Sequence, residues 1–310
     1  MPRQALPAGR SVVGRLDGRV AVVTGAGRGI GREHALLLAS EGAQVVINDL
    51  GGATDGEGSD RTAAELVAAE IEERGGTAVA NGDDVADWEG GQRLIAMALE
   101  TFGGLHILVN NAGILRDRVL VNMTEGDWDS VMRVHLKGHF VPTRFAAAYW
   151  REQAKAGRPV HASVINTTST SGLFSNPGQT NYGAAKSGLA TFTEIAAKEL
   201  ARYDVRVNAI APVARTRLTL STPGLEERIA ARANPDAFDE WDPANISPLV
   251  AWMSTEECDV SGRVFLVKGG QIGVFTPWAI AGEITQPQRW TLDQLDASMG
   301  ALVGQGRSHT

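Results

Sequence analysis

The stretch Thr24-Gly25-Ala26-Gly27-Arg28-Gly29-Ile30-Gly31 decides how the rest of the chain is interpreted. It follows a short apolar run at 20–23 and precedes apolar residues at helical spacing. A strand, a glycine turn and a helix in this order make a phosphate cradle, because glycines let a pyrophosphate approach the free N–H groups at the helix start. The spacing differs from the commoner G-x-G-x-x-G, since position 32 is arginine. We therefore predict a phosphate-binding turn rather than a glycine turn without a ligand.

The composition is that of one sizeable α/β domain with additions. The 310 residues are 43% hydrophobic and 21% charged, and no apolar run reaches the roughly 18 residues that cross a bilayer. The net charge of −7 argues against general nucleic-acid binding, which needs a clustered positive surface. The single cysteine, Cys258, excludes an internal disulfide and suits a reducing compartment. We expect a cytoplasmic protein that binds small molecules, with no nucleic-acid partner and no membrane insertion.

Apolar runs alternate with helix-length segments along most of the chain. The predicted strands are residues 20–23, 44–49, 77–82, 106–111, 163–168, 205–211 and 264–267. One predicted helix begins near Ile30. Four others cover residues 61–74, 87–102, 124–150 and 182–202. This alternation predicts a Rossmann-type, doubly wound parallel sheet with helices on both faces. Ligands of such a sheet bind beyond the carboxyl ends of the strands, so site residues should follow the strands.

We expect three segments in the chain. Residues 1–15 form a flexible N-terminal tail, because they lack an apolar secretory core. Residues 16–270 form the sheet domain, with a substrate lid at about 213–245, and residues 271–310 form a C-terminal extension. In that extension Thr291 and Gln294 predict a capping box that opens a helix over 292–302. The extension could be a lid, an oligomer contact or an ornament. The glycine-rich loop at 51–60 is expected to be mobile.

The second predicted strand ends at Asp49, 18 residues after Gly31. A carboxylate there can accept hydrogen bonds from both hydroxyls of an adenosine ribose and would repel a 2′-phosphate. No basic residue follows it, so we expect NAD, with NADP less favoured because Arg28 in the turn could contact a phosphate. Alternatively, Asp49 merely ends the strand. After the third strand Asp84 and Val85 would flank the adenine.

A second constellation follows the fifth predicted strand. Tyr182 and Lys186 are four apart in a predicted helix and therefore share one face. A free tyrosine has a pKa near 10, and a neighbouring ammonium would lower that pKa and favour proton exchange at neutral pH. Ser169 lies 13 residues before Tyr182 and could bond the same substrate oxygen. A lone Tyr-x-x-x-Lys motif is only a weak indication of an active site. Its combination with Ser169 and the glycine turn is a much more specific indication.

Together TGAGRGIG, Asn110-Asn111-Ala112-Gly113, Ser169 and Tyr182-Gly-Ala-Ala-Lys186 resemble the short-chain dehydrogenase/reductase family over about 16–270. The resemblance implies that Tyr182 donates and accepts the proton, that Lys186 binds the nicotinamide ribose and tunes Tyr182, and that Ser169 orients the carbonyl or hydroxyl. It implies an enzyme that interconverts an alcohol and a ketone. The expected cofactor-binding residues, besides Tyr182 and Lys186, are Gly25, Arg28, Gly29, Ile30, Gly31, Asp49, Asp84, Val85, Asn111, Ala112, Gly113, Pro212, Val213 and Thr216.

One position departs from the family pattern. The helix after the fourth strand usually carries an asparagine that holds a water beside the lysine, and His135 occupies that position here. A histidine can also bond water, so we include His135 among the catalytic residues. His135 and His139 have the i, i+4 spacing of a metal pair, but no third ligand lies near them in the sequence, and we expect no metal.

Several further stretches narrow the substrate. Residues 46–52, 74–81, 109–118, 133–138 and 248–252 are similar to the dehydrogenase unit of peroxisomal multifunctional enzymes of type 2. That resemblance implies oxidation of (3R)-3-hydroxyacyl-CoA with NAD, and activity on 17β-hydroxysteroids. The C-terminal Ser308-His309-Thr310 is not a peroxisomal address. Arginines near the predicted lid could meet coenzyme A phosphates or be solvated helix charges; they are Arg116, Arg118, Arg215, Arg217, Arg228 and Arg232.

Two other functions remain open at this point. A 3-oxoacyl-carrier-protein reductase has the same Ser-Tyr-Lys set but usually prefers NADPH, against which Asp49 counts. A non-catalytic nucleotide-sensing scaffold is the more remote alternative, since Ser169, Tyr182 and Lys186 are all present. By analogy with the family we expect a homodimer or homotetramer.

Overall fold

The computed structural model of the chain describes residues 14–58, 60, 62–220 and 237–305. The chain divides into two compact units, Met1–Val274 and Phe275–Thr310. The predicted tail at 1–15 lies outside the described residues except for its last two, and so does the middle of the predicted lid, with Arg228 and Arg232.

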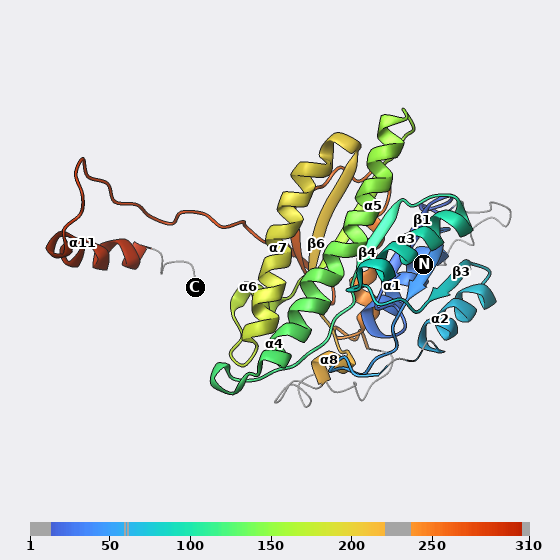
Figure 1. The fold of residues 1–310 in the computed structure, drawn as a ribbon, viewed down its shortest axis with the longest axis horizontal. Helices are drawn as coiled ribbons and strands as arrows, with labels where there is room; N and C mark the ends of the chain where they lie inside the picture. Colours follow the sequence, from blue (N-terminus) through green and yellow to red (C-terminus); the bar gives the residue numbers. More distant parts are fainter. Residues whose placement is uncertain (1–13, 59, 61, 221–236, 306–310) are drawn as a thin grey trace, which may run out of the picture. The chain divides into compact units, whose positions relative to one another are not determined.

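In the described part of the first unit, eight strands form one sheet in the order β3-β2-β1-β4-β5-β6-β7-β8 (Figure 1). All neighbouring strands pair in parallel except β7 and β8. The strands are β1 (Val20–Thr24), β2 (Gln44–Asn48), β3 (Thr77–Asn81), β4 (Ile107–Asn110), β5 (Ala162–Thr167), β6 (Val205–Val213), β7 (Val264–Lys268) and β8 (Gln271–Val274). The predicted doubly wound sheet is therefore confirmed, and its first seven strands lie within two residues of the expected bounds.

The last strand was not predicted. The chain reverses at Gly269, whose φ of +51° is favourable for glycine, and β8 then pairs antiparallel to β7. A four-residue strand after a Gly-Gly pair gives too few alternating positions to be read from the sequence.

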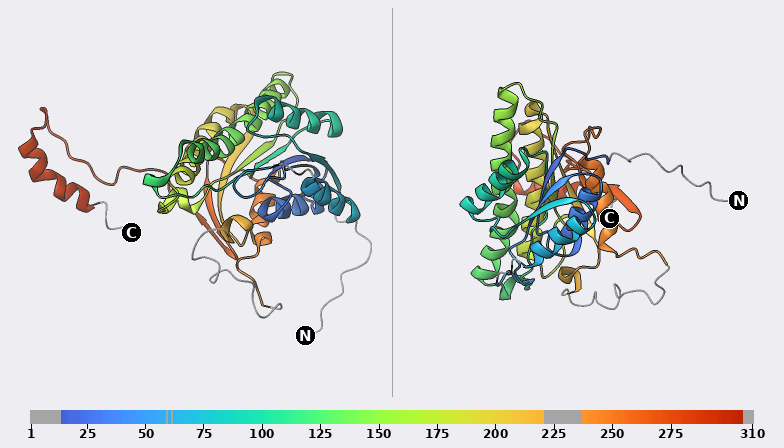
Figure 2. Two further views of the ribbon diagram at one scale, coloured as in Figure 1. Left: turned by 60° about the horizontal axis from the view of Figure 1, so that its bottom comes forward. Right: turned by 90° about the vertical axis from the view of Figure 1, so that its right-hand side faces the viewer.

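Helices cover both faces of the sheet, with α1, α2 and α10 packed on one face and α3, α5 and α7 on the other (Figure 2). The α-helices described in the first unit are α1 (Gly29–Ser40), α2 (Thr62–Glu73), α3 (Trp88–Phe102), α4 (Glu125–Met132), α5 (Gly138–Lys155), α6 (Thr170–Phe174), α7 (Thr180–Leu200), α8 (Arg217–Leu220) and α10 (Ser247–Met253). Short 3-10 segments are η1 (Leu120–Asn122), η3 (Ala201–Tyr203) and η4 (Pro243–Ile246).

The single helix predicted over 124–150 is wrong in one respect. One turn of π-helix, η2 (Arg133–Lys137), separates α4 from α5. A π turn adds one residue to the helical repeat, and an apolar pattern alone does not distinguish it from a continuous α-helix. The turn carries His135 and therefore sets the direction in which this side chain points.

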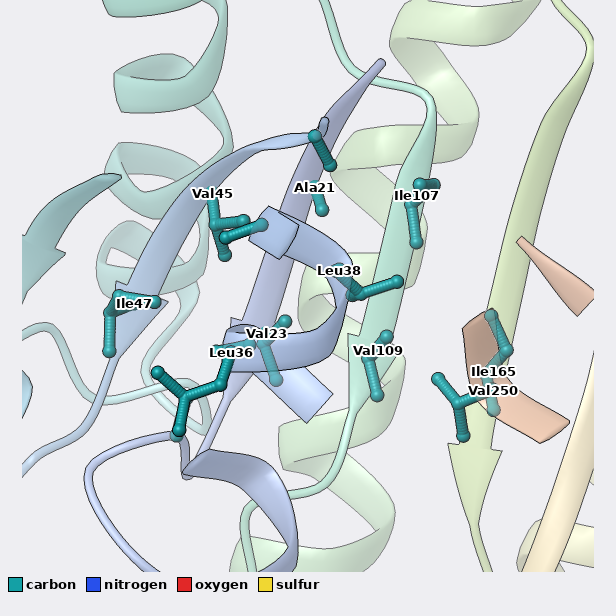
Figure 3. Close-up of a cluster of buried hydrophobic side chains, with 14 of the residues drawn as sticks. Ala21, Val23, Leu36, Leu38, Val45, Ile47, Ile107, Val109, Ile165 and Val250 are labelled. Atoms are coloured by element: carbon teal, nitrogen blue, oxygen red, sulfur yellow. The ribbon is translucent and has the colours of Figure 1, made fainter. Parts of the chain in front are cut away.

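Both faces of the central strands are buried, as expected for a parallel sheet. Along β1, Ala21 and Val23 pack into the cluster beneath α1, whereas Val20 and Val22 belong to the cluster on the opposite face. Figure 3 shows the first cluster, in which Leu38 of α1 lies among side chains of β1, β2 and β4. The core thus fixes the strand ends after which the site residues follow.

In the second unit the structure describes one helix, α11 (Leu292–Gln305). The Thr291 amide donates to Gln294 Oε1 at 3.0 Å and the Gln294 amide donates to Thr291 Oγ1 at 3.3 Å, so the predicted capping box and helix are confirmed. Of the helices that the structure describes in either unit, none has both the length and the apolar character to span a bilayer.

Candidate active site

The glycine turn between β1 and α1 has the shape of an anion cradle. Gly25 and Gly29 have φ values of +62° and +54°. A Cβ at Gly31 would lie 2.2 Å from the Gly25 carbonyl oxygen, and one at Gly25 would lie 2.7 Å from Ala112 Cα. Arg28, the N-cap of α1, makes no side-chain capping bond, so the helix start presents its first N–H groups without a protein cap. The turn therefore fits a dinucleotide pyrophosphate.

Asp49 is held by amides on two sides. Its Oδ2 accepts from the Gly27 amide at 2.8 Å, and its Oδ1 accepts from the Gly51 amide at 2.7 Å. Two bonds at this end of β2 fix the carboxylate next to the glycine turn, where an adenosine ribose would lie. Arg217, considered above for coenzyme A phosphates, also interacts electrostatically with this region. The pKa of Arg217 is lowered mainly by burial and further by Arg28, while Asp49 opposes the shift, so both guanidinium groups act on this region.

The Asn-Asn-Ala-Gly segment after β4 holds the glycine turn in place by hydrogen bonds. The amides of Asn111 and Ala112 donate to Thr24 Oγ1 at 2.9 and 3.1 Å. The Asn111 side-chain amide donates to the carbonyl oxygens of Thr24 and Gly25 at 3.0 and 3.1 Å. These bonds tie the ends of β1 and β4 together, so Asn111 shapes the cradle through the protein backbone.

Gly113 lies against His135. A Cβ at Gly113 would be 2.5 Å from His135 Cε1. The His135 Nε2 lies 2.8 Å from the Ile114 carbonyl oxygen and 3.2 Å from the Ile114 amide nitrogen, and its ring meets the Tyr182 ring edge-on with centroids 5.1 Å apart. The absence of a side chain at Gly113 therefore makes room for the histidine that contacts Tyr182.

Replacing Gly113 with alanine is expected to lower the free energy of unfolding by about 1–3 kcal/mol, because the buried His135 ring must move. Gly126→Ala in α4 is the matched control, since outside the helix backbone its Cβ would meet only Thr124 Oγ1, at an ordinary contact distance of 3.9 Å. Urea unfolding of both variants measures the effect. Equal stability of the two variants would contradict the packing described here.

The remaining residues expected to bind the cofactor include an ion-paired carboxylate, a buried valine and a threonine beside the glycine turn. Asp84 forms an ion pair with Arg133 of η2 and accepts from the Ala86 amide at 2.8 Å, and Val85 is buried. After β6, which includes Pro212 and Val213, the chain returns to the cradle. There the Thr216 Cγ2 lies 3.6 Å from the Cβ position of Gly29. Thr216 and the glycine turn are therefore neighbours.

Ser169, Tyr182 and Lys186 meet beyond the end of β5. Ser169 caps α6, and its Oγ accepts from the Ser171 amide at 3.1 Å. Tyr182 and Lys186 share one face of α7, with Lys186 Nζ 5.5 Å from the Tyr182 ring centroid. The ammonium donates to the Thr167 carbonyl oxygen at 2.5 Å. The side chain of Ser169 interacts with the Tyr182 hydroxyl and partly offsets the rise in its pKa.

The protonation expected from the sequence is corrected by the structure. Burial raises the pKa of Tyr182 to about 12, while Ser169 lowers it and the Asp117 carboxylate raises it further. Burial lowers the pKa of Lys186 from 10.5 to about 7. Burial outweighs any attraction between the ammonium and the phenolate, because Lys186 is itself desolvated at 2% exposure. At neutral pH the phenol holds its proton and the lysine titrates.

The two histidines of this region are fully buried and neutral. Burial lowers the pKa of His135 and of His139 well below 6.5, and the charge of Lys186 lowers both further. Among the described residues, His135 Nδ1 and His139 Nε2 have no hydrogen-bond partner. Across the residues that the structure describes, no group of three or more His, Cys, Asp or Glu side chains is arranged to hold a metal.

Sequence reasoning missed the residues that hold the start of α7. The Asn181 side-chain amide donates to the carbonyl oxygens of Arg116 and Asp127, both at 3.0 Å, and its Oδ1 accepts from the Tyr182 amide at 2.7 Å. Asp117 Oδ2 accepts from Gln179 Nε2 at 2.7 Å, and burial raises the pKa of Asp117. These contacts join segments about 60 residues apart, so no local pattern announces them.

The arginines considered for coenzyme A phosphates have different surroundings. Arg116 forms an ion pair with Glu57, and Arg215 forms one with Asp239. Arg118 is exposed and donates to the Asp117 carbonyl oxygen at 2.9 Å. Arg116 and Arg215 are therefore engaged within the protein, which favours the alternative of structural charges for these two.

A family model described as short chain dehydrogenase matches residues 19–222. The hydroxyacyl-CoA dehydrogenase ChsB1 of Mycobacterium tuberculosis is 43% identical, over 84% of this chain and 81% of its own length. A peroxisomal multifunctional enzyme type 2 of Drosophila melanogaster is 47% identical over 80% of this chain, which spans only 38% of that enzyme. A 3-oxoacyl-[acyl-carrier-protein] reductase of Synechocystis is 37% identical, over 83% of this chain and 98% of its own length.

A solved structure agrees with these sequence matches. The crystal structure of a short chain dehydrogenase from Mycobacterium avium is 48% identical, with a TM-score of 0.84, and the alignment covers 94% of this chain and 96% of that one.

Proposed function

Because this chain belongs to the short-chain dehydrogenase family and is therefore an oxidoreductase of CH–OH groups with a nicotinamide cofactor, we propose that it oxidises (3R)-3-hydroxyacyl-CoA with NAD. The observation that carries the proposal is the meeting of Ser169, Tyr182 and Lys186 beyond β5, on the sheet edge that also holds the glycine turn. The identity to a hydroxyacyl-CoA dehydrogenase over most of both chains supports the substrate class. Steroid side-chain acyl-CoA esters and 17β-hydroxysteroids are further candidate substrates.

In this mechanism the side chains of the protein transfer the proton of the substrate hydroxyl. The substrate hydroxyl bonds Ser169 Oγ and Tyr182 Oη, and on oxidation its proton passes to the Tyr182 phenolate. A nicotinamide cofactor held by the glycine turn and Asp49 would supply the hydride acceptor for the same carbon, so that the alcohol would become the carbonyl as its proton reaches Tyr182. Lys186, whose pKa is lowered to about 7, exchanges a proton at neutral pH and so supports the phenolate when it is charged. In the reverse direction the protonated phenol donates to the developing alkoxide.

Each remaining residue has a proposed place in this site. His135 supports Tyr182 by the ring contact at 5.1 Å. The glycine turn with Ile30 binds the pyrophosphate, Asp49 binds the adenosine ribose, and Thr216 closes over the turn. We further propose residues 16–270 as the catalytic domain with a lid at 213–245 and residues 271–310 as an extension, in a homo-oligomer of the cytoplasm.

The cofactor preference is tested by Asp49→Ala. We expect its ratio of kcat/KM for NAD over NADP to fall roughly 10–100-fold, because the carboxylate no longer binds the ribose hydroxyls or repels a 2′-phosphate. Asp129→Ala, at an exposed carboxylate of α4, is the control and should keep the wild-type ratio. An unchanged ratio in Asp49→Ala would remove Asp49 from this role.

The 37% identity to a 3-oxoacyl-[acyl-carrier-protein] reductase keeps that activity as the second candidate. Steady-state assays with (3R)-hydroxyacyl-CoA esters of several chain lengths and NAD, against 3-oxoacyl-carrier protein and NADPH, separate the two. A clear preference for NADPH and the carrier protein would replace our assignment. The alternative of a non-catalytic nucleotide-sensing scaffold would gain support only if Tyr182→Phe left the biological activity unchanged.

A further inference from the structure

The glycine-rich loop, of which residues 51–58 are described without a gap, contains a hydrogen-bonded turn. The Ala53 amide donates to the Glu57 carbonyl oxygen at 2.8 Å, and the Gly56 amide donates to the Ala53 carbonyl oxygen at 3.0 Å. The loop begins beside the proposed ribose carboxylate, since the Gly51 amide is one of the two donors to Asp49. The path of the loop therefore determines one of the bonds that hold Asp49.

Three contacts fasten this loop to the segment after β4. The Leu115 amide donates to the Thr54 carbonyl oxygen at 2.9 Å. Arg116 Nε donates to the Asp55 carbonyl oxygen at 2.9 Å, and the Arg116 guanidinium pairs with Glu57. Two of the three contacts belong to one side chain. It is 24% exposed, whereas that of Glu57 is 73% exposed, so the arginine is enclosed between the loop and its own segment.

The same segment contacts the helix that carries the catalytic tyrosine. The carbonyl oxygen of Arg116 accepts from Asn181 Nδ2 at 3.0 Å, and Asn181 in turn accepts from the Tyr182 amide. Ile114, two residues earlier, packs on Gly56 of the loop, where a Cβ would lie 3.1 Å from Ile114 Cδ1. Arg116 is thus anchored on the catalytic side through its backbone and on the loop side through its guanidinium.

We propose that Arg116 is a positioning residue for the adenosine end of the cofactor site, where it fastens the loop at 51–58 and thereby holds Asp49 in the orientation that selects NAD. The inference rests on the proposed function, in which Asp49 binds the adenosine ribose. It also assigns a structural partner to a guanidinium that would otherwise be counted as a contact for coenzyme A phosphates.

The physical consequence follows from the bonds involved. Without the Arg116 guanidinium, the loop is held to its segment only by the Leu115–Thr54 bond and by the packing of Ile114 on Gly56. The Gly51 amide is then less firmly placed relative to Asp49, whose Gly27 donor is unaffected. A carboxylate with one weakened donor samples more orientations, so it binds the ribose hydroxyls less well and excludes a 2′-phosphate less strictly.

The test compares Arg116→Gln and Glu57→Gln with Arg151→Gln, which removes an exposed arginine paired with its neighbour Glu152 in α5. Dissociation constants for NAD, NADP and ADP-ribose are measured by calorimetry on the full chain. For Arg116→Gln we expect about five-fold weaker binding of NAD and ADP-ribose and a similar fall in the NAD-over-NADP ratio, the scale of one ion pair with its hydrogen bond. Glu57→Gln should show a smaller loss, and Arg151→Gln none.

Kinetics and exchange measurements separate positioning from general damage. In Arg116→Gln, kcat at saturating NAD should stay within about two-fold of wild type while KM for NAD rises. Amide hydrogen exchange should accelerate at 51–58 and remain unchanged in the central strands. The double variant Arg116→Gln/Glu57→Gln should bind NAD no worse than Arg116→Gln alone, because the two side chains act as one pair.

The outcomes are distinguishable from a failure of the proposed function. If the wild-type protein prefers NADP, the cofactor assignment is wrong. The proposal that Arg116 holds Asp49 to select NAD is then overturned with it. If the wild-type protein prefers NAD and Arg116→Gln keeps both the affinity and the ratio, the inference about Arg116 is overturned while the proposed function stands. Should Arg116→Gln fail to fold, Glu57→Gln decides, and wild-type cofactor binding in that variant overturns the proposal.

Discussion

Replacing Tyr182 with phenylalanine is expected to lower kcat by roughly 10²–10⁴-fold and to change the dissociation constant for NAD very little. The substitution removes one oxygen and keeps the ring that meets His135 edge-on. The site therefore retains its shape but loses the group that takes the substrate proton. Stopped-flow measurement of NADH formation and calorimetric titration of NAD separate the chemical step from binding.

The chain offers a matched control for this variant. Tyr203 of η3 lies under Arg202 and directly precedes β6, so it is at the amino end of this strand, whereas the site lies beyond the carboxyl ends. Tyr203→Phe should therefore retain nearly full kcat. Near wild-type turnover in Tyr182→Phe would remove the phenol from the mechanism and with it the proposed function.

Replacing Lys186 with methionine is expected to abolish most of the activity and to change how stability depends on pH. Burial lowers the pKa of Lys186 from 10.5 to about 7, so the unfolded chain binds more protons than the folded protein between these values. The free energy of unfolding of the wild type therefore rises with pH across this window. A shift of this size corresponds to about 5 kcal/mol. Methionine does not titrate, so its variant lacks the rise.

The expected result is a stability difference that depends on pH. Relative to wild type, Lys186→Met should be most favoured at about pH 7 and should lose several kcal/mol of that advantage by about pH 10. The loss of the bond to the Thr167 carbonyl oxygen offsets part of the gain at every pH. Urea unfolding between these pH values measures the difference, and activity assays measure a fall of at least about 10²-fold. Parallel stability curves would show that the lysine is charged and solvated in the folded protein.

The pKa values of Tyr182 and Lys186 also indicate which protonation state the site favours before the substrate binds. A phenol with a pKa of about 12 beside a lysine with a pKa of about 7 is a proton donor at neutral pH. Asp117 contributes to this, because its carboxylate disfavours the phenolate. The neutral pair is thus prepared for carbonyl reduction, and alcohol oxidation should accelerate as the pH rises toward the tyrosine pKa.

Sequence by itself determined the architecture and which residues share the candidate site. The strand–turn–helix pattern around Gly25, Gly29 and Gly31 needs only local backbone geometry, and the alternation of apolar runs with helical segments leads to one parallel sheet. Tyr182 and Lys186 share a helix face because of their spacing alone. These properties are local, or follow from a repeating pattern, so they can be read along the chain.

Only the tertiary structure decided the environment of those residues. The pKa directions of Tyr182 and Lys186 depend on burial, which outweighs their attraction and reverses the expected acidity of the phenol. The π turn at His135 is a change of helical repeat that the apolar pattern does not reveal. The contact of Arg116 with the loop at 51–58 joins residues about 60 positions apart in the sequence. Desolvation and long-range contacts belong to the packed molecule, because both arise only when distant segments exclude water together.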